Sequence, residues 1–250
     1  MKNLFLLFFL LTGFGAMAQK FIVSGTIEYE VRKNQKKEMS RFDTEEDDNG
    51  FWAQIKDKIP EFSLNYYTYN FNETAGLYKF ERTADKQKLP GWFSRNSEDN
   101  IWYSDYAGST YTNLKVIDDN YIISGKLQKI KWMLSPADQR LIAGFNCRKA
   151  TAILFDSVYV FAYYTDEIAV SGGPMSLHGL PGMILGVTIP RMYTSWVATS
   201  VKLDAGNIAA PTKGKKKTDT EMKTLLTELG KSYGKEYVKY LQPTIWQTFL

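Results

Sequence analysis

The stretch that decides the fold reads Gly172-Gly173-Pro174-Met175-Ser176-Leu177-His178-Gly179-Leu180-Pro181-Gly182-Met183-Ile184-Leu185. Pro181 fixes its own φ at about −65°, has no amide hydrogen, and favours an extended backbone at Leu180. Gly182 then occupies the position at which a type II turn requires a positive φ. The stretch predicts a sharp bend that delivers residues 183–189 into a sheet. Its expected structural residues are Gly173, Pro174, Gly179, Leu180, Pro181, Gly182, Met183 and Ile184.

Short strand-like segments fill most of the chain on both sides of this bend. In residues 21–32 apolar side chains recur at every second position, which is typical of a half-buried strand. Further strands are expected over residues 39–42, 62–72, 77–82, 101–106, 110–117, 121–126, 130–133, 140–154, 157–165, 183–190 and 194–203. Turns are expected over residues 33–37, 118–120, 135–138 and 155–156. Because helices do not alternate with these strands, the pattern favours an antiparallel sheet.

The end of the chain has a helical pattern. Thr218 and Glu221 have the spacing of a capping box, and apolar residues follow at helical spacing. We therefore expect an amphipathic helix over residues 218–241 that lies on the sheet, with a break near Gly230 or Gly234 as the alternative because glycine weakens a helix interior. A shorter helix is expected over residues 51–59. The basic run 213–217 is expected to be a solvated linker, with contact to anionic lipid headgroups as the alternative. The apolar tail 245–250 is expected to pack on the protein or to be bound by a partner.

The fold class predicted from these elements is mainly β: a curved antiparallel sheet or half-barrel meander with a C-terminal helix. Aromatic residues make up 15% of the chain and gather in the expected strands. They could line the concave side of the curved sheet and form an apolar ligand groove, or they could simply fill the core. The residues in question are Tyr66, Tyr67, Tyr69, Phe71, Tyr159, Phe161, Tyr163, Tyr164 and Trp196.

The first residues have the pattern of a secretory signal peptide. Lys2 supplies positive charge, residues 4–14 are apolar but too few to cross a bilayer, and Ala16-Met17-Ala18 resembles a cleavage site. We expect a signal peptide over residues 1–18 and a single domain over residues 19–250 without a transmembrane span. The protein should then reach the periplasm or the outer envelope. The formal charge of +4 gives no argument for binding nucleic acid.

The central motif resembles that of the GLPGLI family of bacterial envelope proteins, which is named for its hexapeptide. This chain carries the hexapeptide as residues 179–184, with Met183 in place of leucine. The resemblance also includes residues 142–151, residues 162–168 and the Gly173-Pro174 pair, and it covers residues 132–203. Asp156-Ser157 stands where the family often has Gly-Arg, and Ala169 stands where it usually has proline. The resemblance implies a secreted envelope protein of uncharacterised activity, with no catalytic residues to carry over.

Three kinds of chemistry are conceivable from the residues themselves. His178, the only histidine, could act as a general base on Ser176 in a hydrolase, or it could hydrogen-bond a loop carbonyl. A copper(I) site is a second possibility, because thioethers and imidazole suit this ion and His178 lies near Met175, Met183 and Met192 in the sequence. The alternative is that these methionines pack in the core or in a loop. Cys147, the only cysteine, excludes an internal disulfide, and it is either a reactive thiol or a small buried hydrophobe.

The interpretation that the sequence favours is a binding or accessory protein, with no cofactor and no metal. Its partner would be an apolar or amphipathic ligand, or another envelope protein. The candidate binding residues are Ser176, His178, Tyr163 and Tyr164. A hydrolase that uses Ser176 and His178 is the first alternative, and a periplasmic copper-binding protein that uses Met175, His178 and Met183 is the second.

Overall fold

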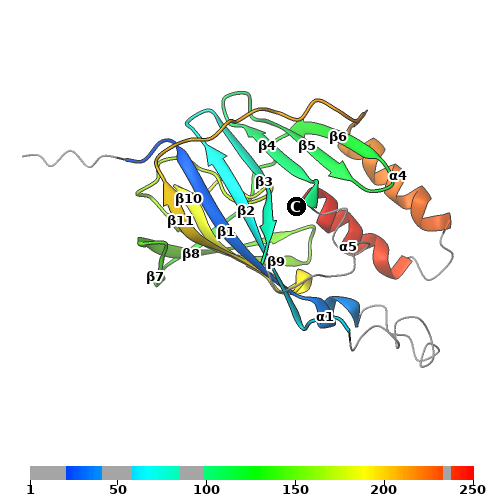
Figure 1. The fold of residues 1–250 in the computed structure, drawn as a ribbon, viewed down its shortest axis with the longest axis horizontal. Coiled ribbons are helices and arrows are strands. Elements are labelled where there is room, and N and C mark those ends of the chain that lie inside the picture. The colour runs from blue at the N-terminus through cyan, green and yellow to red at the C-terminus, as the bar shows by residue number, and fades with distance from the viewer. Residues whose placement is uncertain (1–20, 41–57, 85–97, 233–237) are drawn as a thin grey trace, which may run out of the picture.

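Strand β1 lies in the middle of an open sheet and joins two sequential runs of strands (Figure 1). The computed structural model describes residues 21–40, 58–84, 98–232 and 238–250. The strands are β1 (Gly25–Asn34), β2 (Phe62–Phe71), β3 (Ala75–Thr83), β4 (Ile101–Asp105), β5 (Thr110–Val116), β6 (Asn120–Lys126), β7 (Met133–Ile142), β8 (Phe145–Leu154), β9 (Val158–Thr165), β10 (Met183–Ile189), β11 (Thr194–Lys202) and β12 (Lys215–Lys217). Their order across the sheet is β12-β6-β5-β4-β3-β2-β1-β11-β10-β9-β8-β7.

The position of β1 follows from its side chains and from its two partners. Ile27, Tyr29 and Val31 are buried and alternate with less buried neighbours, as the period-two pattern predicts. On one side β1 pairs antiparallel with β2, and on the other with β11, in a register that sets Val31 opposite Trp196. Every other neighbouring pair is also antiparallel except β12 and β6, which are parallel. The mainly β, antiparallel fold class is confirmed.

The chain connectivity requires the sheet to be strongly curved. Strands lie about 4.8 Å apart, so in a flat sheet of this order β6 and β7 would be separated by about 50 Å. The link from Lys126 to Met133 spans at most roughly 25 Å. The two outer parts of the sheet must therefore approach each other. Helix α5 (Val238–Phe249) lies on the inner side of the resulting curve (Figure 1).

The concave side of the sheet is the hydrophobic core. Its fully buried members come from both runs of strands and include Ile27, Phe71, Val160 and Ile184. Of the aromatic residues considered above, six belong to this cluster: Tyr67, Tyr69, Phe71, Tyr163, Tyr164 and Trp196. On β9, by contrast, the ring of Tyr159 is half exposed. The interpretation that most of these rings fill the core is therefore the better description of them.

Tyrosine hydroxyls attach the glycine-proline segment to the sheet. The hydroxyl of Tyr29 donates to the carbonyl of Ile184, and the hydroxyls of Tyr69 and Tyr106 bond each other. A Cβ at Gly172 would lie 2.4 Å from the Tyr69 hydroxyl oxygen and 2.5 Å from that of Tyr106. The backbone at position 172 therefore approaches these two rings so closely that it requires glycine. The sequence pattern did not reveal this requirement.

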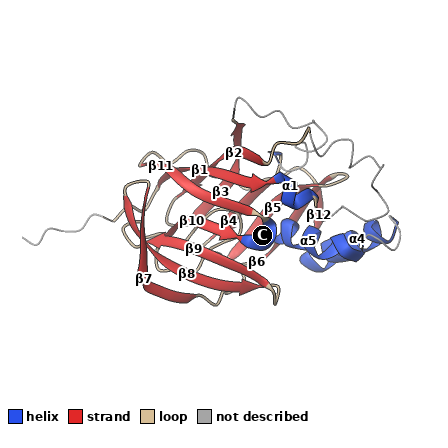
Figure 2. Cartoon of the chain, turned by 90° about the horizontal axis from the view of Figure 1, so that it is seen from below, coloured by secondary structure: helices blue, strands red, loops and turns tan. Residues whose placement is uncertain are grey.

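The helices lie together at one end of the sheet (Figure 2). The region predicted as a helix over residues 218–241, with a break near Gly230 or Gly234 as the alternative, contains two helices, α4 (Asp219–Ser232) and α5; residues 233–237 lie outside the described residues. Thr218 and Glu221 form the predicted capping box, with the Thr218 amide donating to the Glu221 carboxylate at 2.7 Å. Helix α5 includes Pro243 and most of the tail that was expected to pack or be bound. That tail does pack: Trp246 and Leu250 are buried.

Several local predictions were wrong for identifiable reasons. Helix α1 (Gln35–Met39) replaces the turn expected at 33–37, because the Asn34 side chain caps it by accepting from the Lys37 amide. The single strand expected over 140–154 is a hairpin that turns at Ala143 and Gly144, both with positive φ. Residues 135–138 belong to β7, where a register irregularity replaces the expected turn.

The basic run at 213–217 is not a solvated linker throughout, since part of it forms β12 beside β6. A short, lysine-rich edge strand also limits unwanted pairing with other chains. The expected signal peptide, residues 1–18, and most of the helix expected over residues 51–59 lie outside the described residues. Within the described ranges, no helix combines the length and apolar composition needed to cross a membrane.

Candidate functional site

The predicted bend is present, but its turn differs from the expected type. The Gly182 amide donates to the Leu180 carbonyl at 2.8 Å, which closes a three-residue turn around Pro181 instead of a type II turn. Gly182 has φ of 133°, and Gly179 has φ of 90°. A Cβ on Gly182 would lie 2.0 Å from the carbonyl oxygen of Thr165. The bend therefore needs glycine at 182 for both conformation and space.

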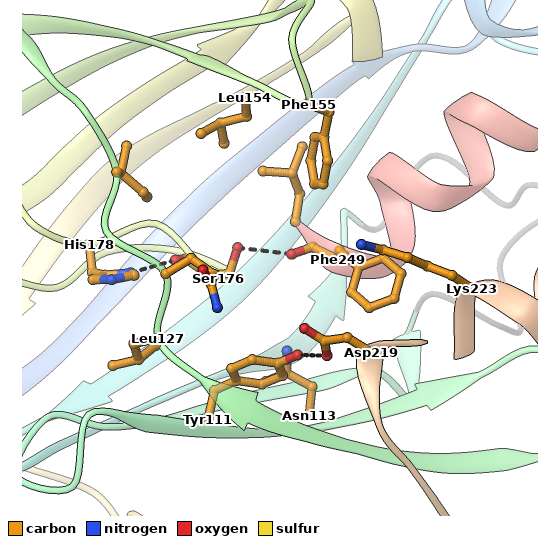
Figure 3. Close-up of a pocket in the computed structure, with 13 residues that line it drawn as sticks. Tyr111, Asn113, Leu127, Leu154, Phe155, Ser176, His178, Asp219, Lys223 and Phe249 are labelled. Carbon is orange, nitrogen blue, oxygen red and sulfur yellow. Dashed lines mark hydrogen bonds between the residues drawn. The ribbon is translucent and has the colours of Figure 1, made fainter. Parts of the chain in front are cut away.

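Ser176 in this loop caps the end of helix α5. Its amide donates to the Leu250 carbonyl at 2.9 Å, and its hydroxyl donates to the Phe249 carbonyl at 3.1 Å (Figure 3). The last carbonyls of a helix have no partner within the helix, so an outside donor satisfies them. The serine hydroxyl thus holds the C-terminal helix against the glycine-proline loop.

His178 is fixed by contacts on both its side chain and its backbone. Its Nδ1 lies 2.8 Å from the Ser176 carbonyl, which can only accept, so Nδ1 carries the hydrogen. The His178 carbonyl accepts from the Trp132 indole at 2.8 Å, which anchors the loop to the link between β6 and β7. The imidazole is half-buried and borders a pocket.

The pocket has a volume of about 260 Å³ and lies where distant segments of the chain meet (Figure 3). Its walls come from β5, the link after β6, the β8–β9 turn, the glycine-proline loop, the start of α4 and the end of α5. The lining residues are Tyr111, Asn113, Leu127, Gln128, Ile130, Leu154, Phe155, Ser176, His178, Asp219, Lys223, Phe249 and Leu250. About half of these residues are apolar, and the others carry polar groups that could orient a ligand.

The polar groups opposite His178 come from α4 and β5. The Tyr111 hydroxyl donates to the Asp219 carboxylate. Burial, with the neighbouring Asp219 charge as a smaller cause, raises the pKa of Tyr111 above its ordinary value. The Lys223 ammonium lies 5.2 Å from the centroid of the Phe249 ring, within reach of a cation–π contact. Among the described residues, the rim therefore carries the Lys223 ammonium beside the Phe249 ring, the hydrogen-bonded Asp219 carboxylate and the His178 imidazole.

This arrangement does not form a catalytic serine–histidine pair. The Ser176 hydroxyl donates to Phe249, and the His178 Nδ1 bonds the Ser176 backbone, so no hydrogen bond joins hydroxyl to imidazole. The two residues are brought together, but as loop-fixing groups. Such a pair would need the base within hydrogen-bond reach of the hydroxyl.

The residues considered for copper belong to different environments. Met175, Met183 and Met192 are buried in the core cluster, and Met183 is fully enclosed in β10. Within the part of the chain that the structure describes, no group of three or more His, Cys, Asp or Glu side chains is placed to hold a metal ion.

Tyr163 and Tyr164, the other candidate binding residues, do not line the pocket. They point to opposite faces of β9: Tyr164 is buried in the core, while the Tyr163 hydroxyl donates to Asp138 at 3.2 Å. Cys147 is fully buried, and this burial raises the pKa of its thiol to about 12. The structure thus favours the buried-hydrophobe interpretation of Cys147 over that of a reactive thiol.

Most pocket residues were missed by sequence reasoning, including Tyr111, Leu154, Asp219, Lys223 and Phe249. They lie in five separated segments, and no local spacing connects them. One signal was available: Asp219 and Lys223 share a helix face four residues apart, immediately after the basic run.

Comparison with known proteins gives a short family match and a similarity of fold. Residues 153–186 match a family model described as a protein of unknown function (Porph_ging). No curated protein matches the chain significantly. Two solved structures of PNGF-II, in space groups P21 and C2, are similar with TM-scores of 0.53 and 0.51 at 14% and 15% identity.

These structural alignments cover 81% of this chain, but only 33% and 32% of the PNGF-II chains. The chain therefore spans about a third of the length of the structures it matches. At this identity the similarity concerns the fold alone. The family match includes the β8–β9 turn and the whole glycine-proline loop, which are two of the walls of the pocket.

Proposed function

We propose that this chain is an exported binding protein that holds an apolar or amphipathic ligand in the pocket between the glycine-proline loop and helices α4 and α5. The observation that carries the proposal is the pocket itself. Its walls combine apolar side chains with polar groups, and several of the polar groups are already hydrogen-bonded to one another. Such an arrangement orients a ligand but supplies no nucleophile.

The size of the pocket limits what it accepts. A volume of about 260 Å³ is at the small end for ligand sites. It suits one part of a ligand, such as an aliphatic chain, rather than a whole drug-sized molecule. An apolar segment of an envelope protein partner could pack against the same pocket walls, because it would offer the same kind of apolar surface as a small ligand.

The N-terminal pattern and the resemblance to GLPGLI proteins support export to the periplasm or the outer envelope. In this proposal residues 19–250 form the single mature domain. N-terminal sequencing of the protein purified from the envelope fraction should begin at Gln19. A mature protein that begins at Met1 would contradict export by cleavage.

Ligand binding is tested by filling the pocket. Leu154→Trp places an indole within the pocket walls, whereas Leu203→Trp adds the same group at a site that is 69% exposed. The probe is 1-anilinonaphthalene-8-sulfonate, whose fluorescence rises in apolar sites. We expect the wild type and the Leu203→Trp variant to bind it equally and the Leu154→Trp variant to bind it weakly. Equal binding by all three would refute the assignment of the site.

A further inference from the structure

Lys115 continues the inner wall of the pocket into the protein. It lies on β5 in line with Tyr111 and Asn113, which border the pocket, because residues two apart on a strand share a face. Lys115 is only 2% exposed. Its Nζ lies 3.7 Å from the centroid of the Trp102 ring on β4. A full-length cationic side chain is therefore enclosed directly behind the pocket.

This lysine has no counter-charge among the described residues. Its one polar contact is a 3.3 Å hydrogen bond from Nζ to the Gln247 carbonyl of α5. Burial lowers the pKa of Lys115 well below its ordinary value. Burying an ammonium group without a carboxylate is strongly unfavourable, so such positions are uncommon outside functional sites.

A second donor beside Lys115 lacks an acceptor altogether among the described residues. The indole Nε1 of Trp102 is buried and makes no hydrogen bond to any described residue. A buried donor without a partner weakens the folded state, because its hydrogen bonds to water are lost. Two donors, one of them able to carry charge, thus stand side by side, and both lack a strong acceptor.

Among the described residues, the end of α5 supplies the one acceptor that Lys115 contacts. The last carbonyls of a helix carry a partial negative charge and attract cations. The Gln247 carbonyl is therefore a weak substitute for an anion at Lys115. The same turn of α5 includes Phe249, which is a wall of the pocket and is held by Ser176.

We propose that Lys115 and Trp102 are the anion-binding end of this site and receive the carboxylate of an amphipathic ligand whose aliphatic chain lies between Leu154 and Phe249. The carboxylate accepts from both Nζ and Nε1. Entry requires the last turn of α5 to move away from β5, so this turn acts as a lid. The inference rests on the proposed function and adds the charge of the ligand and the group that recognises it.

The exposed cation at the rim, Lys223, is the weaker candidate for this role. It is solvated, and ion pairs between exposed groups contribute little. At Lys115 a carboxylate would instead give the Trp102 Nε1 the acceptor it lacks and give Nζ a stronger acceptor than the Gln247 carbonyl. The two lysines can be separated by measurement.

The experiment measures binding of decanoate and of 1-decanol to the mature protein by isothermal titration calorimetry. Lys115→Met removes the charge and keeps the length of the side chain, and Trp102→Phe removes the indole donor. Lys126→Met is the matched control, since Lys126 is an exposed lysine at the end of β6. We expect Lys115→Met to weaken decanoate binding about tenfold or more, Trp102→Phe to weaken it less, and neither to change decanol binding.

The outcomes distinguish this inference from the proposed function. Decanoate binding that is unchanged by Lys115→Met but lost with Lys223→Gln overturns the inference, while the pocket assignment stands. Binding of neither compound by the wild type overturns both. Loss of decanoate and decanol binding together in a folded Lys115→Met variant also overturns the role of charge.

Discussion

Replacing Gly182 by alanine tests whether the bend at residues 179–184 shapes the molecule. The new Cβ would lie 2.0 Å from the Thr165 carbonyl oxygen and 2.7 Å from its carbon, both backbone atoms of β9 that cannot rotate away. The φ of 133° is in addition a conformation open almost only to glycine. Alanine therefore faces conformational strain and a steric clash at once.

The expected magnitude follows from these two terms. Backbone strain of this kind costs about 1–3 kcal/mol, and forcing packed backbone apart costs a further 1–3 kcal/mol or so. Alanine also lowers the conformational entropy of the unfolded chain relative to glycine, which stabilises the folded state by roughly 0.4–1 kcal/mol. We expect the free energy of unfolding to fall by about 2–5 kcal/mol, which is a large share of a typical total of roughly 5–15 kcal/mol.

Gly144→Ala is the matched control. Gly144 has φ of 86°, but a Cβ there meets nothing within 4 Å, so the strain term acts without the clash. Urea unfolding followed by tryptophan fluorescence gives the midpoint and the slope for each variant. We expect Gly144→Ala to lose no more than roughly 1–2 kcal/mol. If Gly182→Ala is destabilised no more than Gly144→Ala, the argument that close packing on β9 fixes the bend is wrong.

The remaining predictions concern buried groups whose protonation or hydrogen bonding the structure defines. Burial lowers the pKa of Lys115 well below its ordinary value, so the contribution of this residue to stability should rise as the pH approaches the ordinary lysine pKa. Between neutrality and about pH 10, urea unfolding should show a steeper rise of the unfolding free energy with pH in the wild type than in Lys115→Met, by up to ~1.4 kcal/mol per pH unit. Burial raises the pKa of Tyr106 to about 12, so its contribution to stability is complete below pH 10 and is lost as the pH rises toward 12. In thermal melts, the stability of Tyr106→Phe should therefore fall less between pH 10 and 12 than that of the wild type. An equal fall in both proteins would contradict this sign. Trp132→Phe removes the indole donor to the His178 carbonyl, which should lower the free energy of unfolding by about 1 kcal/mol. The variant should also bind the fluorescent probe more weakly than the wild type. Unaltered probe binding would show that the Trp132–His178 hydrogen bond is not needed for the pocket.

Much of the fold could be predicted because its signals are local. The hairpins β2–β3, β4–β5 and β5–β6 are marked by period-two strands with turn residues between them. The capping box at Thr218 and the helical spacing of the apolar residues predicted helix α4 near the end of the chain. Gly182 and Pro181 likewise specify a bend through their own backbone preferences, although they did not specify which turn.

The features that could not be predicted depend on contacts between distant residues. Nothing in residues 135–138 separates a turn from an irregular edge strand, because the register of β8 decides between them. The turn at Ala143 places a non-glycine residue at positive φ, which propensity alone does not suggest. The pocket likewise depends on the curvature of the sheet, which brings its outer strands together.

Sequence position also misled the choice of binding residues. Tyr163 and Tyr164 are adjacent and point to opposite faces of β9, yet both are buried in the core cluster and neither reaches the pocket. Ser176 and His178 do border the pocket, so the motif did mark its position. Their roles were not visible, since the partner of the Ser176 hydroxyl lies 73 residues further along the chain.

The central place of β1 has a consequence for a chain that emerges from a ribosome or a translocation channel one residue at a time. β2 can cover one flank of β1 early, but the other flank waits for β11, which begins at Thr194. During that interval β1 presents a row of unpaired amides and carbonyls next to an apolar face, the condition under which nascent strands associate wrongly. Maturation of this protein should therefore be limited by the arrival of its own late strands, and a holding chaperone would act before residue 194 appears.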